Sequence, residues 1–282
     1  MSGADSRTND RILPATRIVA VVIVPFLVAA AVLLFVFPTR SGELFAWQID
    51  APMSAYLLAS AYVGGIWFFV RVAREGRWHR VKEGFPAVTV FAGALLIATL
   101  THLGRFSANL SFWTWLTLYL TTPFAVAILA WLQRDPTRAL DEVDARIPAA
   151  LRVGVILVGT TALALGVVLF FAPQVLIPVW AWQLTPLTAQ VTGAVLSLTG
   201  VVGWGMLREN RWSAFRTLFQ SQLLSIAAIL VSLVLARNDI FWDRPASYGF
   251  AGLVVAAALG YGALTIAMES RARAGAARVR GV

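Results

Sequence analysis

Residues 45–52 of this chain read FAWQIDAP, and residues 180–186 read WAWQLTP. In each case a second shared phrase follows, REGRW at residues 74–78 and RENRW at residues 208–212. The two copies are offset by 135 residues at the Trp-Gln dipeptides and by 134 residues from the following prolines onward. A nearly constant offset over this distance indicates that the chain contains an internal repeat.

The composition indicates the solvent in which the repeat folds. Apolar residues make up 59% of the 282 residues, and charged residues only 13%. A soluble protein needs far more polar surface than this, so the solvent must be largely lipid. A helix needs about 20 apolar residues to cross a bilayer. The sequence therefore predicts an all-α integral membrane protein with eight transmembrane helices, at residues 18–37, 52–72, 86–103, 112–132, 149–172, 186–207, 214–236 and 246–268.

Each copy of the repeat holds four of these spans. A further pair of Phe-Trp dipeptides, at residues 112–113 and 241–242, matches at a reduced offset of 129, which predicts a deletion in an outer loop. Because each copy has an even number of spans, both cross the membrane in the same direction, as parallel repeats about an axis along the membrane normal. The predicted units are an N-terminal four-helix repeat, a charged cytoplasmic linker, and a C-terminal four-helix repeat with a basic tail, at residues 1–132, 133–148 and 149–282.

The distribution of basic residues predicts the orientation. Of the 23 Lys and Arg residues, 19 lie at the two termini or in the loops after the second, fourth and sixth spans. Cytoplasmic loops carry the excess of positive charge, so both termini are expected in the cytoplasm and the protein in the inner (plasma) membrane. The net charge of +9 is then mainly a topology signal. The expected partner is the lipid bilayer, with another membrane subunit or a small lipophilic ligand as further candidates, and no nucleic acid.

The Trp-Gln phrases lie just before the second and sixth spans, on the outer side. An indole ring can lie among acyl chains with its N–H among headgroups, so Trp47, Gln48, Trp182 and Gln183 are predicted to be interfacial anchors. The alternative is a re-entrant segment that contacts a ligand.

The two arginine-rich phrases lie just after the same spans, on the inner side. They predict a matching inner anchor with Trp78 and Trp212 at the headgroup level, or else a docking site for a cytosolic partner. The spans also carry small residues four positions apart, which allow close helix packing. These pairs are Ser60 and Gly64, Ala61 and Gly65, Thr199 and Gly203, and Ala256 and Gly260.

Catalytic chemistry finds little support in the sequence. All 14 carboxylates lie in loops or at span ends, which disfavours proton relays and voltage sensors. Sodium coupling through backbone carbonyls stays open. The absence of cysteine excludes thiolate catalysis and cysteine-ligated metals. No G-x-S-x-G, H-E-x-x-H or Walker A motif is present, so no enzymatic activity and no cofactor are predicted.

Two known kinds of membrane site can be weighed against the predicted topology. His79 and His102 lie on opposite sides of the membrane, so they cannot form a bis-His haem site. Intramembrane prenyltransferases hold magnesium diphosphate between two aspartate-rich motifs, and the two acidic groups of this chain also lie on opposite sides. Those groups are Asp141 with Asp144, and Asn238 with Asp239 and Asp243.

One outer polar cluster stands out. His102 and Arg105 follow the third span, and Glu43 and Asp50 come from the neighbouring outer loop. Together they form a candidate site for a metal or an anionic ligand. The second repeat has no such group, because the alignment places Ala236 opposite His102. Ordinary loop variability is the competing explanation.

The phrases ELFAWQI, THLGRF and REGRW, at residues 43–49, 101–106 and 74–78, resemble a group of uncharacterised multipass bacterial membrane proteins. The resemblance extends over most of the chain. It implies the eight-helix architecture and carries no activity.

Three functions are compatible with these patterns. The first is a non-catalytic structural or accessory membrane subunit. The second is a carrier or permease component that binds a small lipophilic ligand between the repeats, and the third is a membrane enzyme with an outer-surface site. A polar-lined cavity between the halves would favour the carrier, whereas a solid, dry bundle would favour the accessory subunit.

Overall fold

The computed structural model describes residues 10–134 and 144–280. Within these residues the protein is helical, and eight helices are long and apolar enough to cross a membrane. The chain is thus a polytopic membrane protein, and the eight predicted spans are confirmed. The spanning helices are α1 (Pro14–Val36), α3 (Pro52–Arg74), α4 (Gly84–Thr101), α5 (Leu110–Leu132), α6 (Ala149–Phe171), α8 (Pro186–Gly205), α9 (Trp212–Leu235) and α10 (Pro245–Arg280).

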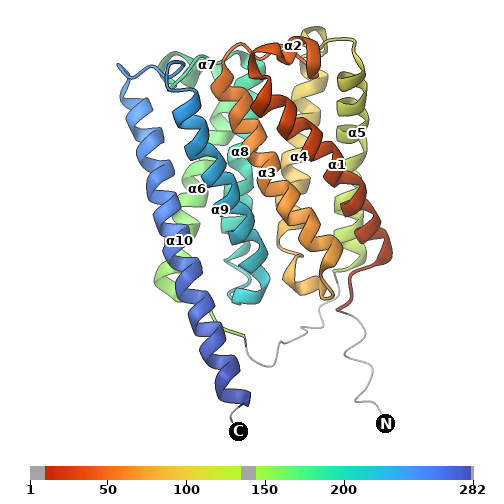
Figure 1. Cartoon of the computed structure of the whole chain (residues 1–282), viewed down its shortest axis with the longest axis vertical. Helices are drawn as coiled ribbons and strands as arrows, with labels where there is room; N and C mark the ends of the chain where they lie inside the picture. The colour runs from red at the N-terminus through yellow and green to blue at the C-terminus, as the bar shows by residue number, and fades with distance from the viewer. Residues whose placement is uncertain (1–9, 135–143, 281–282) are drawn as a thin grey trace.

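The spanning helices run side by side as one bundle (Figure 1). α1 begins and α10 ends at the same end of the bundle, here called the terminal end, and the opposite end is called the distal end. The connections contain short helices and 3-10 turns. These are η2 (Pro38–Arg40), α2 (Ser41–Leu44), η3 (Trp78–Arg80), η4 (Leu103–Arg105), α7 (Pro173–Leu176) and η5 (Ile177–Val179).

Two helices extend furthest beyond the apolar runs predicted for them. α1 begins at Pro14, four residues before the predicted span, and proline suits this first helical position because no N–H is needed there. α10 continues twelve residues past Met268 and extends beyond the bundle (Figure 1). Its last segment, RARAGAARVR, is rich in Ala and Arg, which are strong helix formers in water.

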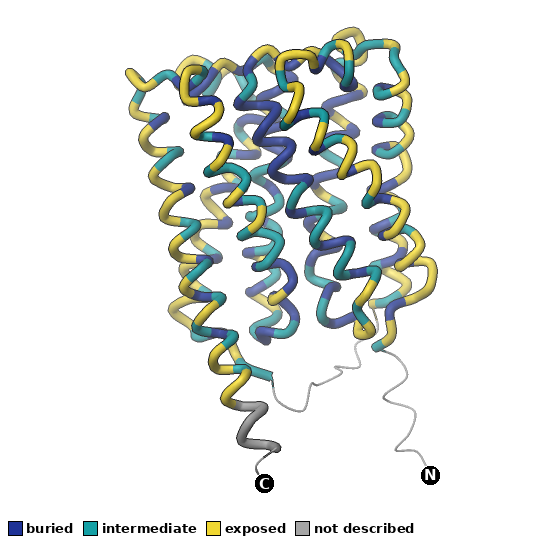
Figure 2. Tube along the Cα trace, in the orientation of Figure 1, coloured by how far each residue is buried: buried dark blue, intermediate teal, exposed yellow. Residues whose placement is uncertain are grey.

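The packing of the helices joins the two halves of the chain. Within the first half α1 packs on α3 and α4 on α5, and within the second half α6 packs on α8 and α9 on α10. Across the halves, α3 packs on α9 and α4 on α8. α3 is the most deeply buried span, whereas α1 and α10 present long exposed faces (Figure 2). Each half therefore completes the core of the other.

Glycines allow α6 and α8 to cross closely. A Cβ added at Gly193 of α8 would lie 2.5 Å from the carbonyl oxygen of Gly166 on α6, so neither position has room for a side chain. Three of the predicted small-residue pairs lie at crossings of this kind, because Cβ atoms at Gly64, Gly65 and Gly203 would meet α9, α1 and α6. Gly260 of the fourth pair faces open space.

The Trp-Gln phrases are only partly at the surface. Gln48 and Gln183 are exposed, but the Trp47 and Trp182 side chains are 1% and 0% exposed. The prediction that these two indoles are interfacial anchors is therefore wrong. Trp47 packs edge-to-face on Trp115, with ring centroids 5.0 Å apart, and Trp182 lies in a second buried cluster. An indole buried among aromatic and aliphatic side chains stabilises the fold more than one held at a membrane surface.

The arginine-rich phrases are also part of the fold. Trp78 and Trp212 are buried, so the inner-anchor prediction for them is wrong as well. Their backbone N–H groups donate to the carbonyls of Asp10 and Ala145, each at 2.8 Å. In each half, the phrase thus holds the segment that precedes the first span.

Matched backbone contacts recur in the two halves. Arg11 pairs with Arg77 and Arg146 with Arg211, while Trp47 pairs with Phe106 and Trp182 with Ile240. The partners are related by offsets of 134 or 135, in agreement with the repeat alignment.

The distal contacts revise one detail of that alignment. The N–H of Ser107 donates to Ala46, and that of Phe241 donates to Ala181, so Ser107 and Phe241 occupy matching places. Phe112 lies inside α5, whereas Phe241 precedes α10. The match of the two Phe-Trp dipeptides, and the deletion inferred from it, therefore do not fit the backbone. Superposition of the halves about an axis along the membrane normal stays a prediction.

Only part of the charged linker lies within the described residues. Gln133 binds the start of α1, accepting from the Leu13 N–H at 2.9 Å and donating to the Thr16 hydroxyl at 2.8 Å. At the other end, Asp144 accepts hydrogen bonds from the backbone and the hydroxyl of Ser213. Asp141 and its neighbours at residues 135–143 lie outside the described residues.

Candidate functional site: a central cavity between the two halves

The outer polar cluster does not form through direct contacts. Glu43 pairs with Arg40 at 2.9 Å, and His102 Nδ1 lies 3.1 Å from a carbonyl oxygen of its own helix. Asp50 and Arg105 are exposed. Among the described residues, no hydrogen bond or ion pair joins any two of Glu43, Asp50, His102 and Arg105, and no three His, Asp or Glu side chains could hold a metal. Their convergence around a bound molecule stays a prediction.

The second histidine belongs to the terminal end. His79 is buried, and its Nδ1 lies 2.6 Å from Asp10 Oδ2. Burial acts to raise the pKa of Asp10, but hydrogen bonds and the charge of His79 outweigh it and hold that pKa below its ordinary value. His79 lies in η3, just before α4 begins, and His102 follows the last residue of α4 at the distal end. The two histidines are therefore a helix length apart, as the sequence predicts.

A polar pocket of about 180 Å³ lies at the terminal end, between the two halves. Glu75 accepts from Arg71 at 3.4 Å and from Arg80 at 3.3 Å, and Arg216 pairs with Glu269 of α10. Because arginines and carboxylates here neutralise one another, the pocket carries little net charge. Each of these ion pairs lies within one half of the chain, and the pocket lies where the two halves meet.

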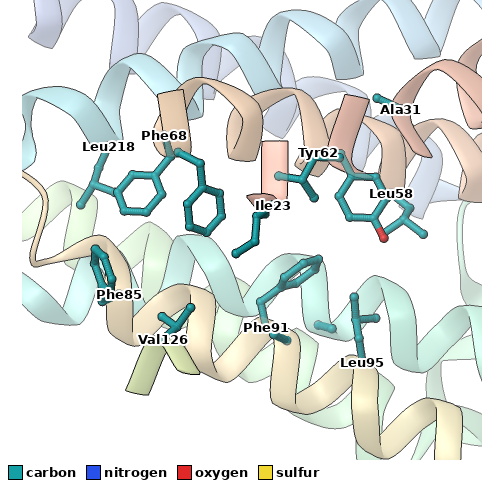
Figure 3. Close-up of a cluster of buried hydrophobic side chains, with 14 of the residues drawn as sticks. Ile23, Ala31, Leu58, Tyr62, Phe68, Phe85, Phe91, Leu95, Val126 and Leu218 are labelled. Carbon is teal, nitrogen blue, oxygen red and sulfur yellow. The ribbon is translucent and has the colours of Figure 1, made fainter. Parts of the chain in front are cut away.

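A cavity of about 110 Å³ lies deeper, within the bundle. Its lining comes from both halves, with side chains from α1, α3, α4 and α5 and from α8, α9 and α10. Figure 3 shows Tyr62 and Phe68 of α3 on one side, Phe91 of α4 on the other, and Ile23 of α1 between them. Leu218 of α9 closes the terminal end.

Small residues of two helices line this space. Ala61, Gly64 and Gly65 of α3 line it, and so do Gly84 and Ala87 of α4. The spacing of the small residues on α3 is a sequence signal for close packing, and they do approach α9 and α1. A Cβ added at Gly84 would likewise meet the Phe68 ring, at 2.4 Å. Sequence reasoning placed a possible ligand between the repeats but missed these residues, because the lining is dispersed over many helices.

The cavity wall is apolar with a few uncharged polar groups. The hydroxyl oxygens of Tyr62 and Tyr119 are 3.0 Å apart, and both side chains are buried. Ser221 Oγ is buried and makes no hydrogen bond within the described residues. No lining residue is charged. A site of this kind suits an uncharged, mostly apolar molecule, because a charged group would lose its hydration without compensation.

A groove of about 200 Å³ between α1 and α5 reaches this cavity from the distal half. Phe26 of α1 and Leu110 of α5 lie along it and are 39% and 83% exposed, so the groove opens to the surroundings of the bundle. Leu27, Tyr62, Leu118 and Tyr119 line both the groove and the cavity. These four residues, here called the waist, lie where the two spaces meet.

Comparisons with protein-family models, with curated proteins and with solved structures found no match for this chain.

Proposed function

We propose that this membrane protein binds a small, uncharged lipophilic molecule in the central cavity, as a carrier or permease component. The observation that carries the proposal is a cavity lined by both halves of the chain and by no charged side chain. The cavity is not the polar-lined one that the sequence led us to expect of a carrier, but an apolar wall with a few converging polar groups is the usual form of a small-molecule site. Molecules dissolved in the lipid are the ones that such a wall favours.

The position of the cavity supports a carrier more than a passive pocket. α3 and α9, which line it, pack on each other across the halves, and so do α4 and α8. A small rotation of one half against the other would therefore change the volume and the opening of the cavity. Paired parallel repeats are a known architecture for such rocking.

The test is occupation of the cavity by a long alkyl chain that carries a photoreactive diazirine. We expect the probe to label residues of α4 and α9 in the protein purified in lipid nanodiscs. Val88→Phe on α4 fills the cavity and should lower this labelling about tenfold, because the wall cannot expand cheaply in a packed bundle. Peptide mass spectrometry locates and quantifies the labels.

Val90→Phe is the matched control, because Val90 lies on the same helix and is exposed. It adds the same ring outside the cavity and should leave the labelling unchanged. Equal labelling in Val88→Phe and in the unmodified protein would contradict the proposal.

A non-catalytic accessory subunit is the second candidate. The observation that favours it is α10, the least buried span. Gly249, Gly252 and Gly260 on this helix each have open space where a Cβ would lie. Small residues on a lipid-facing helix allow the backbone of another helix to approach closely. Failure of the alkyl probe to enter the cavity would favour the accessory-subunit function over the carrier.

The proposed orientation has both termini in the cytoplasm of a bacterial inner membrane, on the strength of the 19 basic residues on that side. The chain has no cysteine, so single cysteines can report on it directly. In intact cells, an impermeant maleimide should label Arg40→Cys at the distal end and leave Arg77→Cys at the terminal end unlabelled. Both positions are exposed in the fold. Labelling of Arg77→Cys alone would show the opposite orientation.

A further inference from the structure

The Tyr62 and Tyr119 hydroxyls hold two O–H donors, but only one of them can donate within the pair. Each phenol has one donor and can accept, so one hydroxyl donates to the other across their 3.0 Å contact. The second proton then needs a different acceptor. Neither hydroxyl makes another hydrogen bond within the described residues. An O–H group left without an acceptor in an apolar interior carries a free-energy cost.

This spare donor lies at the waist. Tyr62 and Tyr119 line both the central cavity and the groove between α1 and α5, together with Leu27 and Leu118. The pair lies where a cavity of about 110 Å³ meets a groove of about 200 Å³ between two spanning helices. A molecule that occupied both spaces would pass directly beside the two hydroxyls.

We propose that the Tyr62–Tyr119 pair is the polar anchor of the site, and that the ligand is a chain-like lipophilic molecule with an uncharged hydrogen-bond acceptor such as a carbonyl. The acceptor receives the spare O–H at the waist. The apolar chain runs along the groove, which is also the access route from the lipid. This inference rests on the proposed function and adds the chemical class of the ligand.

The surroundings select this class over the alternatives. A carboxylate or an ammonium group is disfavoured, because no charged side chain lines the cavity or the groove. A plain hydrocarbon would fit the apolar wall but leave the O–H without a partner. A carbonyl satisfies the donor and brings no proton that would need an acceptor of its own.

The experiment compares two competitors against the alkyl diazirine probe in nanodiscs. One is a long-chain ketone and the other is an alkane of the same chain length. In the unmodified protein the ketone should compete about fivefold better, as expected for one net hydrogen bond. The preference is a ratio within each variant, so it does not depend on how much of that variant folds.

The tyrosine variants test whether one O–H donor of the pair is available to the ligand. Tyr62→Phe leaves the Tyr119 hydroxyl free to donate, and Tyr119→Phe leaves that of Tyr62, so each single variant should keep the preference for the ketone. The double variant should lose it while the probe still labels the cavity. Equal competition by ketone and alkane in the unmodified protein would overturn the anchor and leave the cavity proposal standing. Absence of probe labelling would instead overturn the proposed function.

Discussion

Gly193→Ala is expected to lower the free energy of unfolding by about 1–3 kcal/mol, which is the usual cost of overpacking a close contact. The added methyl would lie 2.5 Å from the carbonyl oxygen of Gly166, and a backbone atom cannot rotate away as a side chain can. α6 and α8 would have to separate along their length. The measurement is unfolding of the purified protein in mixed micelles, followed by circular dichroism.

Gly154→Ala is the matched control on α6, since no atom lies within 4 Å of a Cβ added there. It should be neutral or slightly stabilising, because alanine favours helix over glycine. In the double variant Gly166→Ala with Gly193→Ala, the second methyl should cost less than the first, since the helices are already apart. Strict additivity, or equal effects of Gly154→Ala and Gly193→Ala, would show that the crossing does not depend on these contacts.

Trp182→Ala should lower the free energy of unfolding by more, about 3–5 kcal/mol, which is the range for removing a large buried aromatic side chain. The Trp182 ring is fully buried, and its Nε1 donates to Ser54 Oγ at 2.9 Å. Ser54 belongs to α3 of the first half, so the variant both opens a cavity and removes a hydrogen bond between the halves. The same unfolding assay measures the loss.

Trp113→Ala is the comparison that separates core from surface. Trp113 lies at the distal end of α5 and is 58% exposed. Because Trp113 faces the lipid, its replacement by alanine should lower the free energy of unfolding by less than about 1 kcal/mol, within the range of surface substitutions. If Trp182→Ala were no more harmful than Trp113→Ala, burial of the Trp182 indole would not contribute to the stability of the fold.

The spans were predictable because the lipid dictates them. A helix must hide its own backbone polar groups in hydrocarbon, and apolar runs of the required length leave few alternatives. The ends of the helices were less predictable where the chain leaves the lipid and enters water. Past Met268, helix propensity alone continues α10, and no hydropathy pattern reports that.

The roles of the tryptophans were not predictable from the pattern alone. An indole next to the first turn of a span has the same sequence signature whether it turns outward to headgroups or inward to the core. Trp47 turns inward because Phe45, Phe106 and Trp115 surround it, and these residues come from three separate segments. Only the packing of those segments brings the aromatic group together.

The candidate site was hidden for a related reason. Tyr62 and Tyr119 are 57 residues apart and belong to helices that are not consecutive in the chain. Polar residues at mid-span are a signal for such a site, but a tyrosine in an apolar run is also common in a packed core. Glu43 and His102, which stand out in the sequence by their charge or metal-binding side chains, each bond within their own segment instead.

The pairing of α3 with α9 and of α4 with α8 determines when this protein can become complete during synthesis. α3 ends at Arg74 and α9 begins at Trp212, so at about 5–20 residues per second the ribosome needs roughly 7–30 s to make the intervening chain. Through that interval α3 stands in the bilayer without its long-range partner, with Ser54, Ser60 and Gly64 turned to lipid or to whatever holds the nascent chain. The packing surface of the newly synthesised first half therefore stays uncovered until the second half has been made, and the time of synthesis sets when folding can finish.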